Sequence, residues 1–163
     1  YRLPVCVTRC GNLFGGGDLN FNRIVPGTIR SALRNESPII RSDGTLKRDY
    51  FYVRDAADAY LKLAERMEAA DCHGEAFNFS LEQPMTVLDI TRATLLQMKK
   101  TNLKPDIRNE VSGEILNQYL SAEKARKALG WKPRFSLAEG LAETIRWYED
   151  YFAEQPNRRR HGP

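Results

Sequence analysis

Short runs of β-branched and aromatic residues alternate along this chain with segments whose apolar residues recur every three or four positions, and this alternation restricts the fold most. Runs at residues 4–9, 38–41, 50–53 and 75–80 predict strands. The segments between them predict helices, because that spacing places apolar side chains on one helix face. The mixture predicts an α/β protein. A length of 163 residues, without internal repeats or low-complexity linkers, suits a single domain with its own core.

Capping residues mark the starts of three predicted helices. Asp55 is expected to cap a helix that follows the strand at 50–53. Thr86 with Asp89, and Ser136 with Glu139, have the spacing of a capping box, in which each side chain bonds the other residue's backbone N–H. The helix after Asp55 is expected to bury one stripe of side chains, which consists of Ala57, Tyr60, Leu61, Ala64 and Met67.

The composition and the motifs argue against several classes of protein. No apolar run reaches the roughly 20 residues of a membrane-spanning helix, so no membrane partner is expected. The three cysteines form neither a CxxC pair nor an even framework, which favours a reducing, cytoplasmic location without structural zinc. His73 and His161 lie in no nucleophile or metal-binding pattern. GxSxG, Walker and HExxH motifs are absent as well, so these classes of catalytic site and a metal site are not expected in this chain.

The charge is positive but dispersed. The formal net charge is +4, and residues 156–163 predict a disordered basic tail after a domain at 1–155. The arginines follow no nucleic-acid-binding module, so nucleic acid is not expected as a partner. A basic surface also suits a phosphorylated small molecule. The chain opens at Tyr1 without a methionine, so we expect it to be part of a larger protein.

Two polar side chains stand where ligands of α/β sheets bind, at or beside strand ends. Asn12 follows the first strand, where its amide either contacts a phosphate or a sugar hydroxyl, or only satisfies the turn backbone. Arg48 precedes another strand, where its planar guanidinium either grips a diphosphate or pairs with Asp49 or Asp55. The glycines at 15–17 lack GxGxxG spacing and predict a tight turn rather than a phosphate loop.

Taken together, several segments resemble one family in that family's order. Residues 8–18 resemble the Arg-x-x-Asn-x-Tyr-Gly-x-Gly-Asp segment of the extended short-chain dehydrogenases/reductases (SDRs), the NAD-dependent nucleotide-sugar epimerases and dehydratases. Residues 42–56 resemble its Gly-x-Gly-x-x-x-Arg-Asp-aromatic-x-x-Val-x-Asp signature, and residues 77–80 its Tyr-Asn-Ile-Gly strand. Residues 129–133 and 139–148 are similar to its C-terminal helices. Finer details at 10–21 and 117–121 are most similar to the branch that dehydrates CDP-glucose.

The resemblance implies the C-terminal part of an extended SDR fold: edge strands of a Rossmann-type sheet plus a small mixed α/β lobe that binds the substrate. It implies a nucleoside diphosphate sugar as ligand and NAD as the family's cofactor. By this resemblance the substrate-binding residues are Asn12, Arg23, Ile24, Ile40, Arg48, Asn78 and Tyr119. Cys10 and Gly11 fall where the family's backbone approaches the nicotinamide.

The departure from the family is equally informative. The half that carries GxGxxG, the Tyr-x-x-x-Lys pair and the catalytic carboxylates has no counterpart here, so we expect substrate grip without chemistry and no tight NAD binding by this chain alone. The missing half, or self-association through the sheet edge at Val5–Val7, is the expected partner. Three alternatives remain: a 4-epimerase fragment, a stand-alone nucleotide-sugar-binding or partner protein, and a folded fragment without function.

Overall fold

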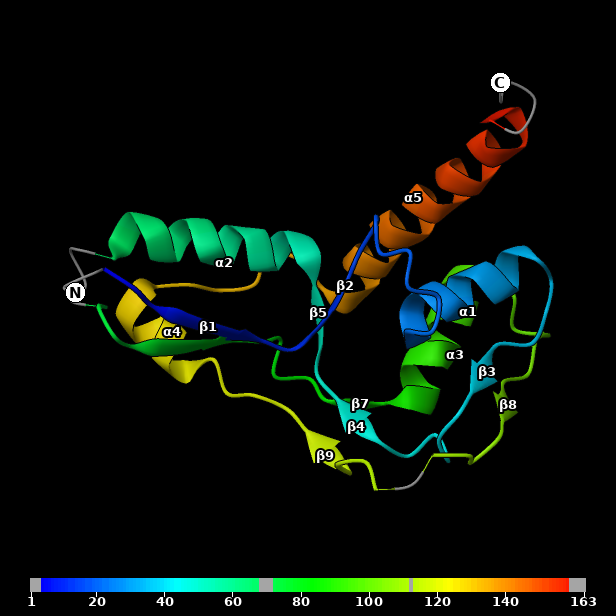
Figure 1. Cartoon of the computed structure of the whole chain (residues 1–163), viewed down its shortest axis with the longest axis horizontal. Helices are drawn as coiled ribbons and strands as arrows, with labels where there is room; N and C mark the ends of the chain where they lie inside the picture. The colour runs from blue at the N-terminus through cyan, green and yellow to red at the C-terminus, as the bar shows by residue number, and fades with distance from the viewer. Residues whose placement is uncertain (1–3, 68–71, 112, 159–163) are drawn as a thin grey trace.

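The computed structural model describes residues 4–67, 72–111 and 113–158. Strands and helices mix along this part of the chain, as the sequence predicts (Figure 1). The elements are β1 (Val7–Cys10), β2 (Asn12–Phe14), α1 (Ile24–Leu33), β3 (Ile39–Ile40), β4 (Lys47–Arg48), β5 (Tyr50–Tyr52), α2 (Val53–Arg66), β6 (Ala76–Phe79), β7 (Met85–Thr86), α3 (Val87–Gln97), β8 (Asp106–Ile107), β9 (Asn117–Gln118), α4 (Glu123–Leu129) and α5 (Leu137–Arg158).

The strands pair in small, mostly parallel sheets. β1 pairs with β6, β2 with β5 and β3 with β8, each pair parallel. β4 lies between β7, which is antiparallel to it, and β9, which is parallel. Because β2 follows β1 after one residue, the chain passes from the first sheet to the second at Gly11. Asn12 therefore sits where two parallel strand pairs meet, beside its partner Tyr50.

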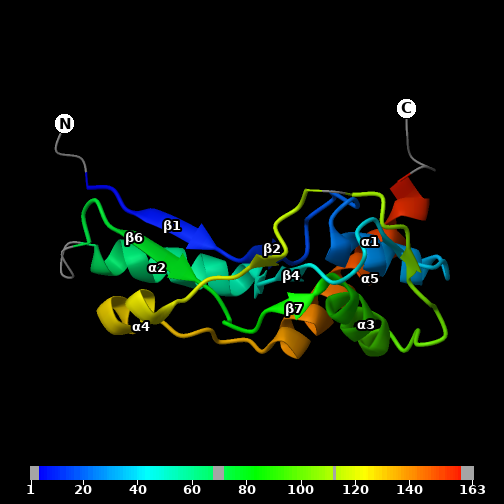
Figure 2. The same cartoon turned by 90° about the horizontal axis from the view of Figure 1, so that it is seen from below.

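Two hydrophobic clusters form the core. The helices that contribute to them, α2 and α4 for one and α1, α3 and α5 for the other, lie toward opposite ends of the molecule in Figures 1 and 2. α2, α4 and the β1–β6 pair surround the first cluster, whose largest side chain is Trp131. Helices α1, α3 and α5 surround the second. Its buried residues are Phe14, Val25, Ile29, Tyr50, Tyr52, Ile90, Leu141, Ile145 and Tyr148. Strand β5 contributes Phe51 to one cluster and Tyr50 and Tyr52 to the other, so it joins both.

Two of the predicted helix starts are confirmed. At the start of α3, the Thr86 hydroxyl accepts from the backbone N–H of Asp89 at 3.0 Å, and the Asp89 carboxylate accepts from the N–H of Thr86. Before α5, Glu139 accepts from the N–H of Ser136 at 2.8 Å, and Ser136 accepts in return. Both reciprocal caps satisfy backbone donors that a helix leaves open at its N-terminus.

The predictions for α2 are wrong in two respects. Asp55 lies inside the first turn and its buried carboxylate accepts from the backbone N–H groups of Arg134 and Phe135, so it fastens the 134–135 segment instead of capping its own helix. The buried stripe is also different. Tyr60 and Leu61 are exposed. The inward-facing residues of α2 are Asp55, Ala56, Ala59 and Leu63.

Among the described residues no strand pairs with the outer edge of β1, and apolar side chains at and just before its start are exposed. Val5 is 59% exposed and Val7 is 52% exposed, while the other edge of β1 pairs with β6. The predicted association through this edge stays a prediction.

At the other end of the chain, α5 continues through Arg158, beyond the boundary predicted at residue 155. Residues 159–163 of the predicted tail lie outside the described part. No helix in the described ranges has the length and apolar character needed to cross a membrane.

Candidate ligand-binding site

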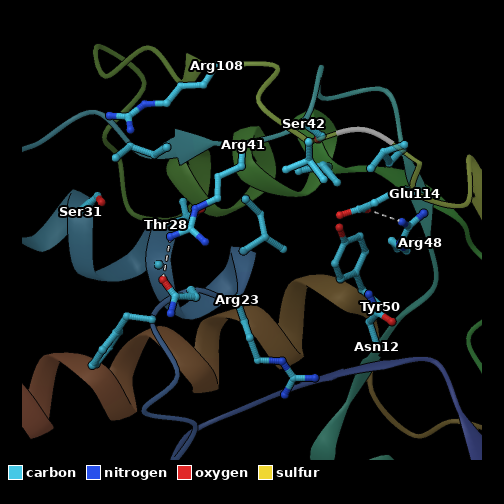
Figure 3. Close-up of a pocket in the computed structure, with 18 of the residues that line it drawn as sticks. Asn12, Arg23, Thr28, Ser31, Arg41, Ser42, Arg48, Tyr50, Arg108 and Glu114 are labelled. Carbon is cyan, nitrogen blue, oxygen red and sulfur yellow. Dashed lines mark hydrogen bonds and ion pairs between the residues drawn. The ribbon is translucent and has the colours of Figure 1, made fainter.

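A pocket of about 440 Å³ opens between α1, β3, β4 and the segment around residues 108–114 (Figure 3). Its lining carries a strong excess of positive charge, because among the residues that the structure describes it includes five arginines and a single carboxylate, that of Glu114. The arginines are Arg23, Arg30, Arg41, Arg48 and Arg108. Such a pocket attracts an anionic ligand. Among the described residues, no group of three or more His, Cys, Asp or Glu side chains could hold a metal ion.

Asn12, Arg48 and Tyr50 lie together on one side of this pocket (Figure 3). The β2–β5 pairing sets Asn12 opposite Tyr50, and Arg48 lies on β4 directly before β5. Burial raises the pKa of the Tyr50 phenol well above its ordinary value, so this group stays neutral. A neutral phenol beside an amide and a guanidinium offers hydrogen bonds without repelling an anion.

The Arg48 guanidinium donates hydrogen bonds to the segment that follows β8. Its Nη2 atom donates to Glu114 Oε2 at 2.9 Å, and its Nη1 atom donates to the carbonyl oxygen of Ile115 at 2.7 Å. The Arg48 side chain is only 11% exposed, whereas that of Glu114 is 46% exposed. The predicted pairing of Arg48 with Asp49 or Asp55 is therefore replaced by a pairing with Glu114. An anionic ligand at Arg48 must compete with that carboxylate.

Replacing Glu114 with glutamine is expected to strengthen binding of inorganic pyrophosphate by up to about fivefold. The change removes a competing charge, because Glu114 forms an ion pair with the largely buried side chain of Arg48. Such a pair contributes on the order of 1 kcal/mol. Isothermal titration calorimetry measures the effect. Glu110→Gln is the matched control, because Glu110 lies on the same segment but does not line the pocket. Equal affinity of Glu114→Gln and the wild type would contradict the competition.

The opposite side of the pocket is built from α1 and the strand β3. Arg23 precedes α1 and pairs with Asp18 at 3.1 Å, and Ile24 begins the helix. Arg41 follows β3 and donates to the Asn22 side chain at 2.8 Å. Both contacts are exposed, and only the one with Asp18 neutralises charge, so both arginines can exchange these partners for a ligand. Figure 3 shows Thr28, Ser31, Arg41 and Arg108 on this side, away from Arg48 and Tyr50.

The structure brings four of the predicted substrate-binding residues to one pocket and leaves the others elsewhere. Those four are Asn12, Arg23, Ile24 and Arg48. The prediction for Ile40 needs correction, because its side chain is 1% exposed and packs into the core, while its neighbour Ile39 lines the pocket. Asn78 lies half-buried on β6 and is not part of this lining.

Tyr119 and the two residues predicted to face a cofactor share a second, smaller hollow. Cys10, Gly11 and Tyr119 line a space of about 40 Å³, which also touches Asn12. A Cβ atom at Gly11 would lie 2.5 Å from the carbonyl oxygen of Asp49. Packing within the chain therefore requires this glycine. The placement of Cys10 and Gly11 beside a nicotinamide stays a prediction.

The pocket residues that sequence reasoning missed include Thr28, Arg108 and Glu114. Arg108 pairs with Asp106 at 3.0 Å and reaches the pocket because β8 pairs with β3. That pairing joins segments more than 60 residues apart, and no local pattern announces it.

Asp49 orders the backbone beneath this site. Its carbonyl accepts from the N–H of Asn12. Its buried carboxylate accepts from the Ser80 hydroxyl and, at 3.4 Å, from the N–H of Leu120. Burial raises the pKa of the Asp49 carboxyl above its ordinary value, although both of those hydrogen bonds act in the opposite direction. Asp49 thus links β5, the end of β6 and the segment after β9.

The raised pKa of Asp49 predicts a specific pH dependence. A carboxyl with a higher pKa in the folded state binds more protons there than when unfolded, so its contribution to stability falls as pH rises through the interval between the two pKa values. Asp49→Asn removes this dependence. Relative to the wild type, the free energy of unfolding of the variant is expected to increase as pH rises above the ordinary range of an aspartyl carboxyl. Urea denaturation at several pH values measures it.

Asp43→Asn is the control of opposite sign. Hydrogen bonds from the Thr45 N–H and hydroxyl lower the pKa of Asp43, so its contribution is present at higher pH and is lost as pH falls. Relative to the wild type, Asp43→Asn should therefore lose stability as pH rises. If the Asp49→Asn difference followed the same direction, the assigned effect of burial would be wrong.

The sequence is similar to that of known nucleotide-sugar dehydratases. Residues 1–79 match the model of the NAD dependent epimerase/dehydratase family. The chain is 26% identical to dTDP-D-glucose 4,6-dehydratase of Homo sapiens over 162 residues, which covers 96% of this chain and 45% of the relative. It is 27% identical to dTDP-glucose 4,6-dehydratase 1 of Escherichia coli (strain K12), with 91% and 42% covered. The chain thus spans less than half the length of these relatives.

Solved structures extend the similarity to the fold. The crystal structure of dTDP-glucose 4,6-dehydratase from Bacillus anthracis in complex with NAD aligns with a TM-score of 0.80 at 27% identity, covering 92% of this chain and 46% of that one. UDP-glucose 4-epimerase from Thermotoga maritima with UDP-glucose gives the same TM-score and identity, with 90% and 46% covered. The predicted α/β architecture therefore corresponds to about half of such a chain.

Proposed function

We propose that this chain is a partial member of the NAD-dependent epimerase/dehydratase family of extended SDRs and that it supplies the substrate grip of a nucleotide-sugar 4,6-dehydratase. The similarity of residues 1–79 to that family, and of the whole fold to its solved structures, supports the proposal. The observation that carries the proposal is the meeting of Asn12 and Arg48 on the wall of one arginine-rich pocket. An amide and a guanidinium so placed suit the oxygens of a diphosphate. In this role Arg48 and Asn12 hold the diphosphate, while Arg23 and Ile24 contact the nucleoside.

No catalytic step is assigned to this chain's residues. The carboxylates of Asp49 and Asp55 are buried and bonded to backbone N–H groups, as structural carboxylates are. Neither Tyr50 nor Tyr52 is followed by a lysine four positions later. In a family that uses NAD, the bound cofactor would supply hydride transfer, and by the family resemblance Cys10 and Gly11 would lie beside its nicotinamide ring. The proposed role therefore comprises binding and orientation of the substrate only.

Calorimetric titration of the chain with CDP-glucose, UDP-glucose and dTDP-glucose tests the proposal. Saturable heat with at least one of them, and none with free glucose, is the expected result, because the grip acts on the charged diphosphate. CDP-glucose is the sugar nucleotide that the sequence favours, whereas the relatives named above carry dTDP and UDP in their names. The order of the three affinities therefore tests the choice of nucleobase. Absence of heat with all three would exclude the proposed grip.

A 4-epimerase is the second candidate. The epimerase structure from Thermotoga maritima aligns as well as the dehydratase structure, with a TM-score of 0.80 in both cases. The two enzymes would share the same grip, so binding alone does not separate them. Mixing the chain with an N-terminal half of either kind, and analysing the product for a 4-keto-6-deoxy sugar or a 4-epimer, distinguishes them.

A further inference from the structure

The hydroxyl of Thr28 is unusual among the buried threonines of the helices. Thr91, Thr94 and Thr144 each donate to the backbone carbonyl four residues earlier, at distances of 2.8, 2.8 and 2.6 Å. Thr28 is equally buried, at 1% exposure, yet its Oγ1 atom has no hydrogen-bond partner in the described part of the chain. A buried hydroxyl without a partner costs free energy, and valine would fill the same volume without that cost.

The position of Thr28 offers a reason for this cost. Thr28 lies on α1 and lines the arginine-rich pocket, together with Ser31 and Arg41. Figure 3 places it on the side opposite to Arg48, Tyr50 and Glu114. A diphosphate held at Arg48 would therefore extend its nucleoside toward Thr28. Ribose hydroxyls and base edges carry polar groups of the kind that a single hydroxyl can bond as donor or acceptor.

We propose that Thr28 is a specificity-determining residue, whose hydroxyl forms a hydrogen bond with the nucleoside part of the bound nucleotide. This inference rests on the proposed function and adds to it a residue of the nucleoside end. The unpartnered hydroxyl and its place on the pocket wall both point to the ligand. A purely structural threonine would bond the carbonyl of Ile24, as its three counterparts bond theirs.

Thr28→Val provides the test, because the two side chains have the same shape and only the hydroxyl is lost. Affinities for CDP, UDP, dTDP and inorganic pyrophosphate are measured by calorimetry, and the melting temperature is recorded. We expect the affinity for the preferred nucleoside diphosphate to fall about tenfold, because the loss of one hydrogen bond has an effect of that size. The affinity for pyrophosphate should stay unchanged. The melting temperature should stay equal or rise, because an unpartnered polar group is removed. Thr28→Ser should retain the affinity.

Thr94→Val is the matched control, a buried helical threonine outside the pocket whose hydroxyl is already bonded to Ile90. It should bind all four compounds as the wild type does. dTDP lacks the ribose 2′-hydroxyl that CDP carries. If Thr28→Val lost equal affinity for CDP and for dTDP, the hydrogen bond of Thr28 would involve a different group of the nucleoside. Unchanged nucleotide affinity in Thr28→Val, or loss of folding in that variant, would overturn the inference. If the wild type bound pyrophosphate and showed no preference for any nucleotide, the inference would fail and the proposed diphosphate grip would stand. If the wild type bound none of the compounds, both the inference and the proposed function would fail.

Discussion

Replacing Trp131 with alanine is expected to lower the free energy of unfolding by about 3–5 kcal/mol. The Trp131 side chain is fully buried and meets the rings of Phe51 and Phe79 edge-on, with centroids 5.8 and 5.1 Å away. These rings come from β5 and β6, so the indole fills the space between the two strand pairs. Removing it leaves a cavity that the surrounding strands cannot close without losing their pairing. Urea denaturation followed by circular dichroism measures the loss.

Trp147→Ala is the control for Trp131. Trp147 is 36% exposed on α5, where it stacks on Tyr151 at 5.1 Å, so its loss should cost much less. Trp131→Phe keeps a ring in the cluster and removes the indole N–H, which has no partner among the described residues. This variant should be more stable than the alanine variant and remains measurable if that one does not fold. Equal stability of Trp131→Ala and Trp147→Ala would contradict the assignment of Trp131 to the centre of the core.

The elements that local signals specify were predictable. Thr86 with Asp89, and Ser136 with Glu139, form their caps within four residues of chain, so the pattern alone determines the geometry. The strands at β1, β5 and β6 were also located, because runs of β-branched and aromatic residues have few other stable conformations. What these signals do not specify is which strand pairs with which.

The buried face of α2 shows why periodicity alone fails. The helix carries two apolar stripes, and the larger side chains, Tyr60 and Leu61, lie on the exposed one. The smaller residues Ala56 and Ala59 face inward because β5 and the first cluster approach closely there. Ile39 and Ile40 illustrate the same difficulty in a strand. Successive side chains point to opposite faces, so an error of one position exchanges the pocket wall for the core.

Only part of the candidate site could be predicted from the sequence. Asn12 and Arg48 stand at strand ends that the sequence locates, and the family resemblance supplied their roles. Glu114 and Thr28 carry no such signal. Glu114 reaches the pocket only through the long segment between β8 and β9, and the hydroxyl of Thr28 is distinctive only because a local bond is missing. Contacts that depend on tertiary placement were therefore accessible only from the structure.

Replacing Arg48 with alanine is expected to weaken binding of the preferred nucleotide sugar by about 10- to 100-fold, which corresponds to roughly 1.5–3 kcal/mol for a charge-assisted hydrogen bond. Arg48→Lys keeps the charge but loses the planar pair of donors, so it should recover only part of the affinity. Arg134→Ala is the matched control, because Arg134 is an exposed arginine that pairs with Asp58 outside the pocket. Arg48 also anchors the carbonyl of Ile115, so melting temperatures must accompany the titrations. Loss of affinity without loss of folding locates the diphosphate at Arg48, whereas wild-type affinity in Arg48→Ala would remove the basis of the proposed grip.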